Sequence, residues 1–116
     1  MMKQWRTWGR KSTICFFLMC ALELCRGTGT VMAGKEEGRK LFEERNCIAC
    51  HSLGDKKGAA AQFGGSLDHV GNKLHADWLE GYLRDPKSKM PEARMPEEDL
   101  SDQQINDLVA YLVSLK

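Results

Sequence analysis

The sequence predicts an all-α fold after residue 33, and three observations lead to that class. Apolar residues recur at helical spacing in segments 36–45, 75–85 and 101–116. No segment shows the sustained alternation of polar and apolar residues that is typical of a strand. A Cys-x-x-Cys-His motif at residues 47–51 lies between the first two helices. The domain is therefore expected to be small, helical and built around a cofactor.

The first predicted helix, residues 36–45, carries a glycine in its interior. Gly38 and Phe42 are four residues apart and share one face of this helix. A glycine inside a helix costs about 1 kcal/mol relative to alanine, so it needs a structural reason. We interpret Gly38 as the point where another helix crosses closely; the alternative is a weak helix in which the glycine has no role.

Residues 47–51 read Cys-Ile-Ala-Cys-His, which is the pattern of a c-type haem attachment site. The spacing puts both thiols on one side of a turn, where each can form a thioether to a porphyrin. The adjacent imidazole of His51 can then bind the iron. A zinc knuckle needs a second ligand pair, and a thioredoxin-like pair expects a βαβ setting. The motif therefore predicts haem c, bound through Cys47 and Cys50, with His51 on the iron.

Two segments between the helices predict irregular structure. Residues 52–71 are punctuated by glycines without a helical or strand period, so we expect a loop that wraps the cofactor. The second helix, 75–85, ends at Pro86, because proline cannot continue the hydrogen-bond ladder. Residues 86–96 hold all three prolines and are expected to be rigid and extended.

The last helix begins at Ser101. Ser101 and Gln104 fit a capping box, which satisfies free backbone N–H groups at a helix start. Four apolar residues then fall on one face at helical spacing, namely Ile105, Leu108, Val109 and Leu112.

Residues 1–33 have the layout of a secretory signal peptide. A basic stretch precedes an apolar run at 14–24, and Val31 and Ala33, small or modest residues at the −3 and −1 positions, predict cleavage before Gly34. We therefore expect a cleaved signal peptide, a mature domain of residues 34–116 and a periplasmic location. The alternative is an uncleaved leader that serves as a membrane anchor, and the apolar run is short for this because it would hardly span a bilayer. Lipidation at Cys25 fits poorly, because Glu23 and Leu24 precede it where small residues are expected.

Cleavage would change both the charge and the cysteine content. From Gly34 onward the chain carries 12 Lys and Arg against 15 Asp and Glu, and its only cysteines are those of the motif. This mild acidity argues against nucleic-acid binding, which usually needs a basic face. A chain this short builds a marginal hydrophobic core, and a bound haem would add apolar bulk.

From Gly34 to Lys116 the chain resembles the class I monohaem cytochrome c family. The matching features are Gly38, Phe42, 47–51, Leu67–Gly71, Trp78–Leu83, Asp85–Pro86, Arg94–Pro96, Leu100–Ser101 and Leu108–Leu112. The resemblance implies a small cytochrome c-like fold around a covalently bound haem. In that fold the first and last helices cross at Gly38, and Phe42 meets Leu108 and Tyr111.

The resemblance also implies the sixth iron ligand. Met95 fits the family position best, which gives His51 and Met95 as the axial pair. Met90 also precedes a proline and stays an alternative, and His69 or His75 could in principle give bis-histidine coordination.

One departure from the family concerns the residues before Leu67. The family often has Gly-Pro there, and the proline carbonyl accepts the other N–H of the axial histidine. This chain has Gly65 and Ser66, so we expect the carbonyl of Ser66 to accept that hydrogen bond.

The resulting prediction is a one-electron carrier, not an enzyme, that meets other redox proteins through brief contacts with small interfaces. Lysines could ring the exposed haem edge, namely Lys56, Lys57, Lys87 and Lys89. Two alternatives stay open. One is a pentacoordinate haem protein that binds or reduces a small ligand, and the other is a haem subunit of a larger respiratory enzyme.

Overall fold

The computed structural model describes residues 29–116, with side chains from Gly34 onward. The chain divides into two units, 1–30 and 31–116, and the second is the domain described below. The predicted signal peptide, 1–33, lies outside the described residues except for the first turn of a helix, so its cleavage stays a prediction. Among the helices of this described part, none is both long enough and apolar enough to cross a bilayer.

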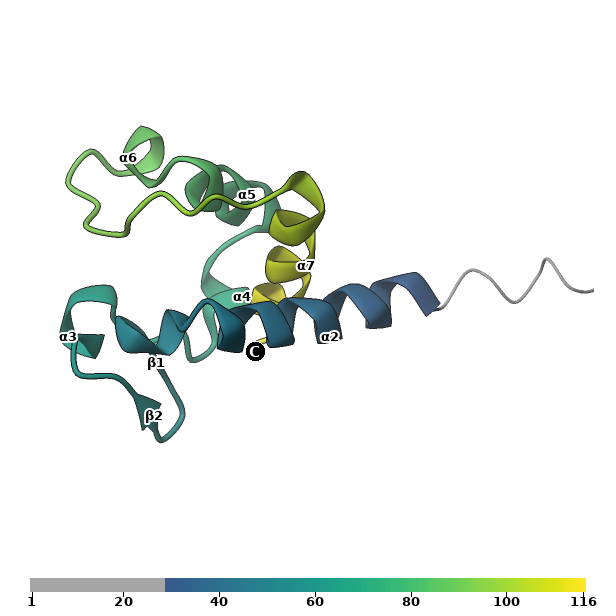
Figure 1. Cartoon of the computed structure of the whole chain (residues 1–116), viewed down its shortest axis with the longest axis horizontal. Coiled ribbons are helices and arrows are strands. Elements are labelled where there is room, and N and C mark those ends of the chain that lie inside the picture. Colours follow the sequence, from purple (N-terminus) through teal and green to yellow (C-terminus); the bar gives the residue numbers. More distant parts are fainter. Residues whose placement is uncertain (1–28) are drawn as a thin grey trace, which may run out of the picture. The chain divides into compact units, whose positions relative to one another are not determined.

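The domain is mostly helical, as predicted (Figure 1). Its elements, in order, are α2 (Gly29–Glu44), the 3-10 turn η1 (Cys47–Ala49), β1 (Ser52–Leu53), β2 (Lys56–Lys57), α3 (Ala61–Gly64), α4 (Val70–Lys73), α5 (Ala76–Arg84), α6 (Pro86–Lys89) and α7 (Asp102–Val113). The three longest helices, α2, α5 and α7, are those that the periodicity predicted.

Helices α2 and α7 cross at Gly38, which confirms the predicted reason for this glycine (Figure 1). A Cβ at Gly38 would overlap the backbone carbonyl of Asp107 and would lie 2.9 Å from the Cβ of Tyr111. One turn further along, the rings of Phe42 and Tyr111 pack with centroids 5.5 Å apart and planes tilted by 58°. The absence of a side chain at Gly38 thus lets the two helices approach at backbone distance.

Helix α7 supplies half of the buried core. Its start has the predicted capping box: the Ser101 hydroxyl accepts from Gln104 N at 3.3 Å, and the Gln104 side chain accepts from Ser101 N at 3.0 Å. The side chains of the hydrophobic core cluster come from α2, α4, α5 and α7, and they are Leu41, Phe42, Val70, Leu79, Leu83, Ile105, Leu108, Val109, Tyr111 and Leu112. The core therefore lies where these helices meet α7.

The prediction of a continuous loop at 52–71 was wrong in detail. Strands β1 and β2 pair antiparallel, with Ser52 opposite Lys57 and Leu53 opposite Lys56, and Gly54 turns the hairpin with φ +57°. The single-turn helices α3 and α4 follow. Elements of two to four residues are too short to produce a readable period in a sequence, which is why the pattern missed them.

The segment 86–96 also differs from the predicted extended form, because it opens with the one-turn helix α6. Pro86 occupies the first helical position, where its fixed φ is favourable and its missing N–H costs nothing. The Asp85 carboxylate caps this turn by accepting the backbone N–H of Ser88 at 3.1 Å. The proline ends α5, as predicted, and at the same time begins α6.

Candidate functional site

The motif 47–51 folds as a tight turn after α2. Asn46 takes a left-handed conformation with φ 53°, and the N–H groups of Cys50 and His51 both donate to the carbonyl of Cys47. Cys47 is half-buried, Cys50 is exposed and both are free thiols. Burial raises the pKa of the Cys47 thiol, and the nearby negative charge of Glu98 raises it further by a smaller amount. Both thiols are thus available for thioether formation from a single turn.

The glycine-containing segment 58–64 packs against this turn and is hydrogen-bonded to it. Gly58 N donates to Ile48 O at 2.8 Å, and Gly64 N donates to Cys50 O at 2.9 Å. A Cβ at Gly58 would lie 2.5 Å from the Ala49 Cα, and one at Gly64 would lie 2.8 Å from the His51 Nδ1. Larger residues would push this segment away from the motif, so the glycines there serve close backbone approach.

The imidazole of His51 is half-buried and has a backbone partner. Its Nδ1 lies 3.3 Å from the carbonyl oxygen of Gly65. Because a carbonyl can only accept, Nδ1 carries the proton in this contact, and the lone pair of Nε2 is left free for a metal. The expectation that Ser66 would supply this carbonyl was wrong. The reason is the local pairing, in which Ser52 N donates to Gly65 O at 3.1 Å and Leu67 N donates to Ser52 O at 2.9 Å.

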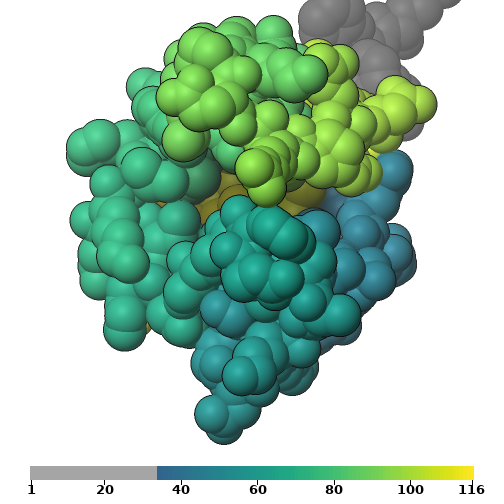
Figure 2. All heavy atoms as spheres, turned by 90° about the vertical axis from the view of Figure 1, so that its left-hand side faces the viewer, coloured from purple at the N-terminus to yellow at the C-terminus, as the bar shows by residue number. Residues whose placement is uncertain are grey.

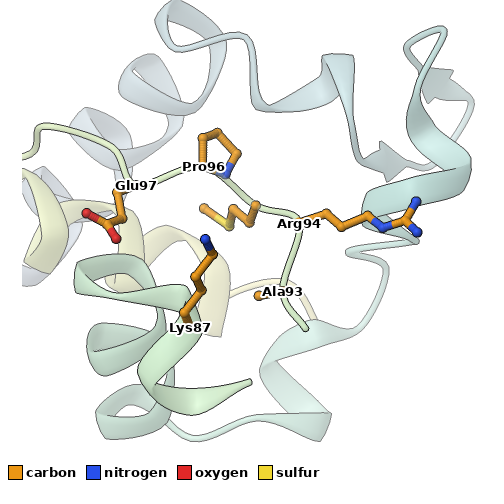
Figure 3. Close-up of a pocket in the computed structure, with 6 residues that line it drawn as sticks. Lys87, Ala93, Arg94, Pro96 and Glu97 are labelled. Carbon is orange, nitrogen blue, oxygen red and sulfur yellow. The ribbon is translucent and has the colours of Figure 1, made fainter. Parts of the chain in front are cut away.

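Met95 and Met90 differ in burial. Met95 is half-buried, packs against the hydrophobic core and lines a hollow of about 390 Å³. The other lining residues of this hollow are drawn in Figure 3, and they are Lys87, Ala93, Arg94, Pro96 and Glu97. Met90 is 44% exposed. A ligand inside the domain needs the more buried thioether, so the geometry favours Met95.

The two remaining histidines lie outside the core. His69 is exposed and adopts a left-handed φ of 58° directly before α4. His75 is also exposed and stands at the N-cap of α5. Neither position favours an axial role, and within the described residues no group of three or more His, Cys, Asp or Glu side chains gathers as a metal site.

One face of the domain is hollowed beside the loop that carries Met95. Figure 2 shows this hollow, with atoms of α7 in yellow at its floor. Several apolar side chains of the domain stay only partly buried against the core, namely Ile48, Leu53, Leu67, Leu74, Trp78 and Met95. Two free thiols, an imidazole with a free Nε2, a half-buried thioether and incompletely covered apolar side chains supply the chemical groups that a covalently bound haem needs.

A contact between Arg94 and Phe63 joins the loop of Met95 to α3. The guanidinium carbon of Arg94 lies 5.7 Å from the centre of the Phe63 ring, which is the geometry of a cation–π contact. Phe63 is 62% exposed even with this contact. Sequence reasoning missed this pair, because nothing in the pattern relates two residues so far apart in the chain.

Comparison with known proteins gives two findings. The family model described as Cytochrome c matches residues 35–116 of the chain. Cytochrome c oxidase subunit 2 of Alkalihalophilus pseudofirmus is 38% identical over 86 residues, which covers 69% of this chain and 25% of that protein. The chain therefore spans about a quarter of the length of this relative.

Proposed function

Because this chain belongs to the cytochrome c family and carries electrons through covalently bound haem c, we propose how its own residues hold that group. Cys47 and Cys50 would form the two thioether bonds, and His51 and Met95 would bind the iron. The haem iron supplies one-electron exchange between its ferric and ferrous states.

The protein residues keep the metal environment constant during this exchange. The carbonyl of Gly65 holds the tautomer and orientation of His51 through Nδ1. The thioether of Met95, which is half-buried against the core, would be the second iron ligand and would leave no open site for a small ligand. Electron transfer would then require little movement of the protein.

The observation that carries the ligand assignment is the difference in burial between Met95 and Met90. The matched test replaces each methionine by leucine, which conserves volume and removes the sulfur. We expect Met95→Leu to open the iron, so that carbon monoxide shifts the visible spectrum of the reduced protein. Met90→Leu should leave that spectrum unchanged by carbon monoxide. A shift in Met90→Leu alone, or in neither variant, would overturn the assignment.

The domain is further proposed to work in the periplasm as residues 34–116, after removal of the signal peptide 1–33. We propose that its partners are other redox proteins, which it contacts briefly, and that it does not bind nucleic acid. The test is the mass of the exported protein. A chain that begins at Gly34 in the soluble fraction supports the proposal, and a full-length chain held in membranes supports the alternative of an uncleaved anchor.

A second candidate is a haem subunit of a larger respiratory enzyme. The similarity to a cytochrome c oxidase subunit 2 favours it, although this chain spans only a quarter of that relative. The two candidates differ in native size. Co-migration of the haem with a large complex from mild detergent extracts supports a subunit, and migration as a small free protein supports a shuttle.

A further inference from the structure

Residues 64–67, at and after the end of α3, run beside residues 50–52, which include His51. Three backbone hydrogen bonds tie them together: Gly64 N to Cys50 O at 2.9 Å, Ser52 N to Gly65 O at 3.1 Å and Leu67 N to Ser52 O at 2.9 Å. These bonds lie on both sides of the carbonyl of Gly65. The position of this carbonyl against the imidazole is therefore set by how firmly the two segments hold together.

The backbone of residues 64–66 is not stiff by itself. It reads Gly64-Gly65-Ser66, and Gly65 has a φ of +73°, in a region that glycine enters freely. A proline at this place would restrict φ, but the chain has none between residues 52 and 85. Some other group has to restrain the carbonyl.

Asp68 provides such a restraint with both carboxylate oxygens. Oδ1 accepts the backbone N–H of Gly54 at 2.8 Å, across the gap between the two segments. Oδ2 accepts the hydroxyl of Ser66 at 2.6 Å, and Asp68 N donates back to the Ser66 Oγ at 3.0 Å. The carboxylate thus adds one more hydrogen bond between the two segments and fixes the turn that follows Gly65.

We propose that Asp68 is a positioning residue for His51, because its carboxylate joins Ser66 to Gly54 and so keeps the Gly65 carbonyl on the imidazole Nδ1. This inference rests on the proposed role of His51 as an iron ligand. Hydrogen bonds from Ser66 and then Gly54 also hold the pKa of Asp68 below its usual value, so the group stays ionised. Charge-assisted hydrogen bonds of this kind are stronger than neutral ones.

The chemical consequence reaches the iron through the imidazole. A hydrogen bond from Nδ1 to a carbonyl raises the basicity of the ring and favours the ferric state. Loss of the restraint should loosen that bond, expose the Nδ1 proton to water and raise the reduction potential.

The experiment compares Asp68→Ala with Asp55→Ala in the haem-loaded protein. Asp55 is exposed in the turn of the β1–β2 hairpin, beside Gly54. Its variant removes one negative charge and keeps the hydrogen bonds between the two segments. Ser66→Ala is a second variant that keeps every charge and decides the question if Asp68→Ala does not fold. The measurements are the solvent exchange rate of the His51 Nδ1 proton, by NMR of the reduced protein, and the reduction potential.

We expect exchange about tenfold faster in Asp68→Ala and in Ser66→Ala than in Asp55→Ala. The reduction potential of Asp68→Ala should exceed that of Asp55→Ala. Equal exchange rates and potentials would overturn the role of Asp68 while leaving His51 as a ligand. If His51 of the unmodified protein shows no ring-current-shifted ring protons, the ligand assignment itself fails, and the positioning role fails with it.

Discussion

Replacement of Gly38 by alanine should destabilise the domain, although alanine is the better helix former. The substitution gains about 1 kcal/mol from helix propensity. Against this gain, the new Cβ would overlap the Asp107 carbonyl and lie 2.9 Å from the Tyr111 Cβ. The atoms in the way belong to the backbone of α7 and to the root of a buried side chain, so they cannot move without shifting the helix.

Overpacking of this kind typically costs 1–3 kcal/mol, and a clash with backbone belongs at the upper end of that range. We therefore expect a net loss of about 2 kcal/mol, which lowers the melting temperature of a domain this size by about 10 °C. The assay is thermal and urea unfolding of the haem-loaded protein, followed by far-ultraviolet circular dichroism.

Gly81→Ala is the matched control for this prediction. Gly81 also lies inside a helix, but a Cβ there meets only the flexible end of the Lys89 side chain. Alanine at this position should be neutral or stabilise by up to about 1 kcal/mol. If Gly38→Ala unfolds at the same midpoint as Gly81→Ala, the reasoning on the helix crossing is refuted.

Three further predictions concern other contacts of the domain. Phe63→Leu should speed imidazole binding to the oxidised protein about threefold in stopped-flow experiments, because it removes the cation–π contact with Arg94 that holds the Met95 loop; an unchanged rate contradicts this. Asp68→Asn should be less stable than the parent at neutral pH. Since the pKa of Asp68 is lowered, its contribution is present above its usual range and lost as the pH falls through the lowered value. A difference in urea midpoints that persists in strong acid would oppose this linkage. Ser101→Ala should cost about 1 kcal/mol in urea unfolding through loss of the α7 cap, and an unchanged midpoint would speak against it.

The long helices could be predicted because their signals are local and repeated. The apolar face of α7 and the cap formed by Ser101 and Gln104 both lie within a few residues of each other, so sequence spacing is enough. The role of Gly38 followed from the cost of a glycine in a helix, which demanded a close neighbour. The family resemblance then identified that neighbour as the last helix.

The features that sequence reasoning missed depend on pairings between distant residues. The carbonyl of Gly65, and not that of Ser66, meets the imidazole because the backbone hydrogen bonds of Ser52 fix the register between the two segments. This register cannot be predicted from the local sequence. The Asp68 link to Gly54 depends on that same register. Likewise, Met95 and Met90 have similar local sequences, and burial separates them only after the loop is folded.

The most direct test of the central claim is the visible spectrum of the exported, reduced protein before and after addition of carbon monoxide. With haem held by Cys47 and Cys50 and the iron closed by His51 and Met95, we predict a c-type spectrum that carbon monoxide leaves unchanged. A clear shift would mean an open or labile iron, which contradicts the closed coordination of an electron carrier. A protein without covalent haem would contradict the attachment of haem through Cys47 and Cys50, and with it the central claim.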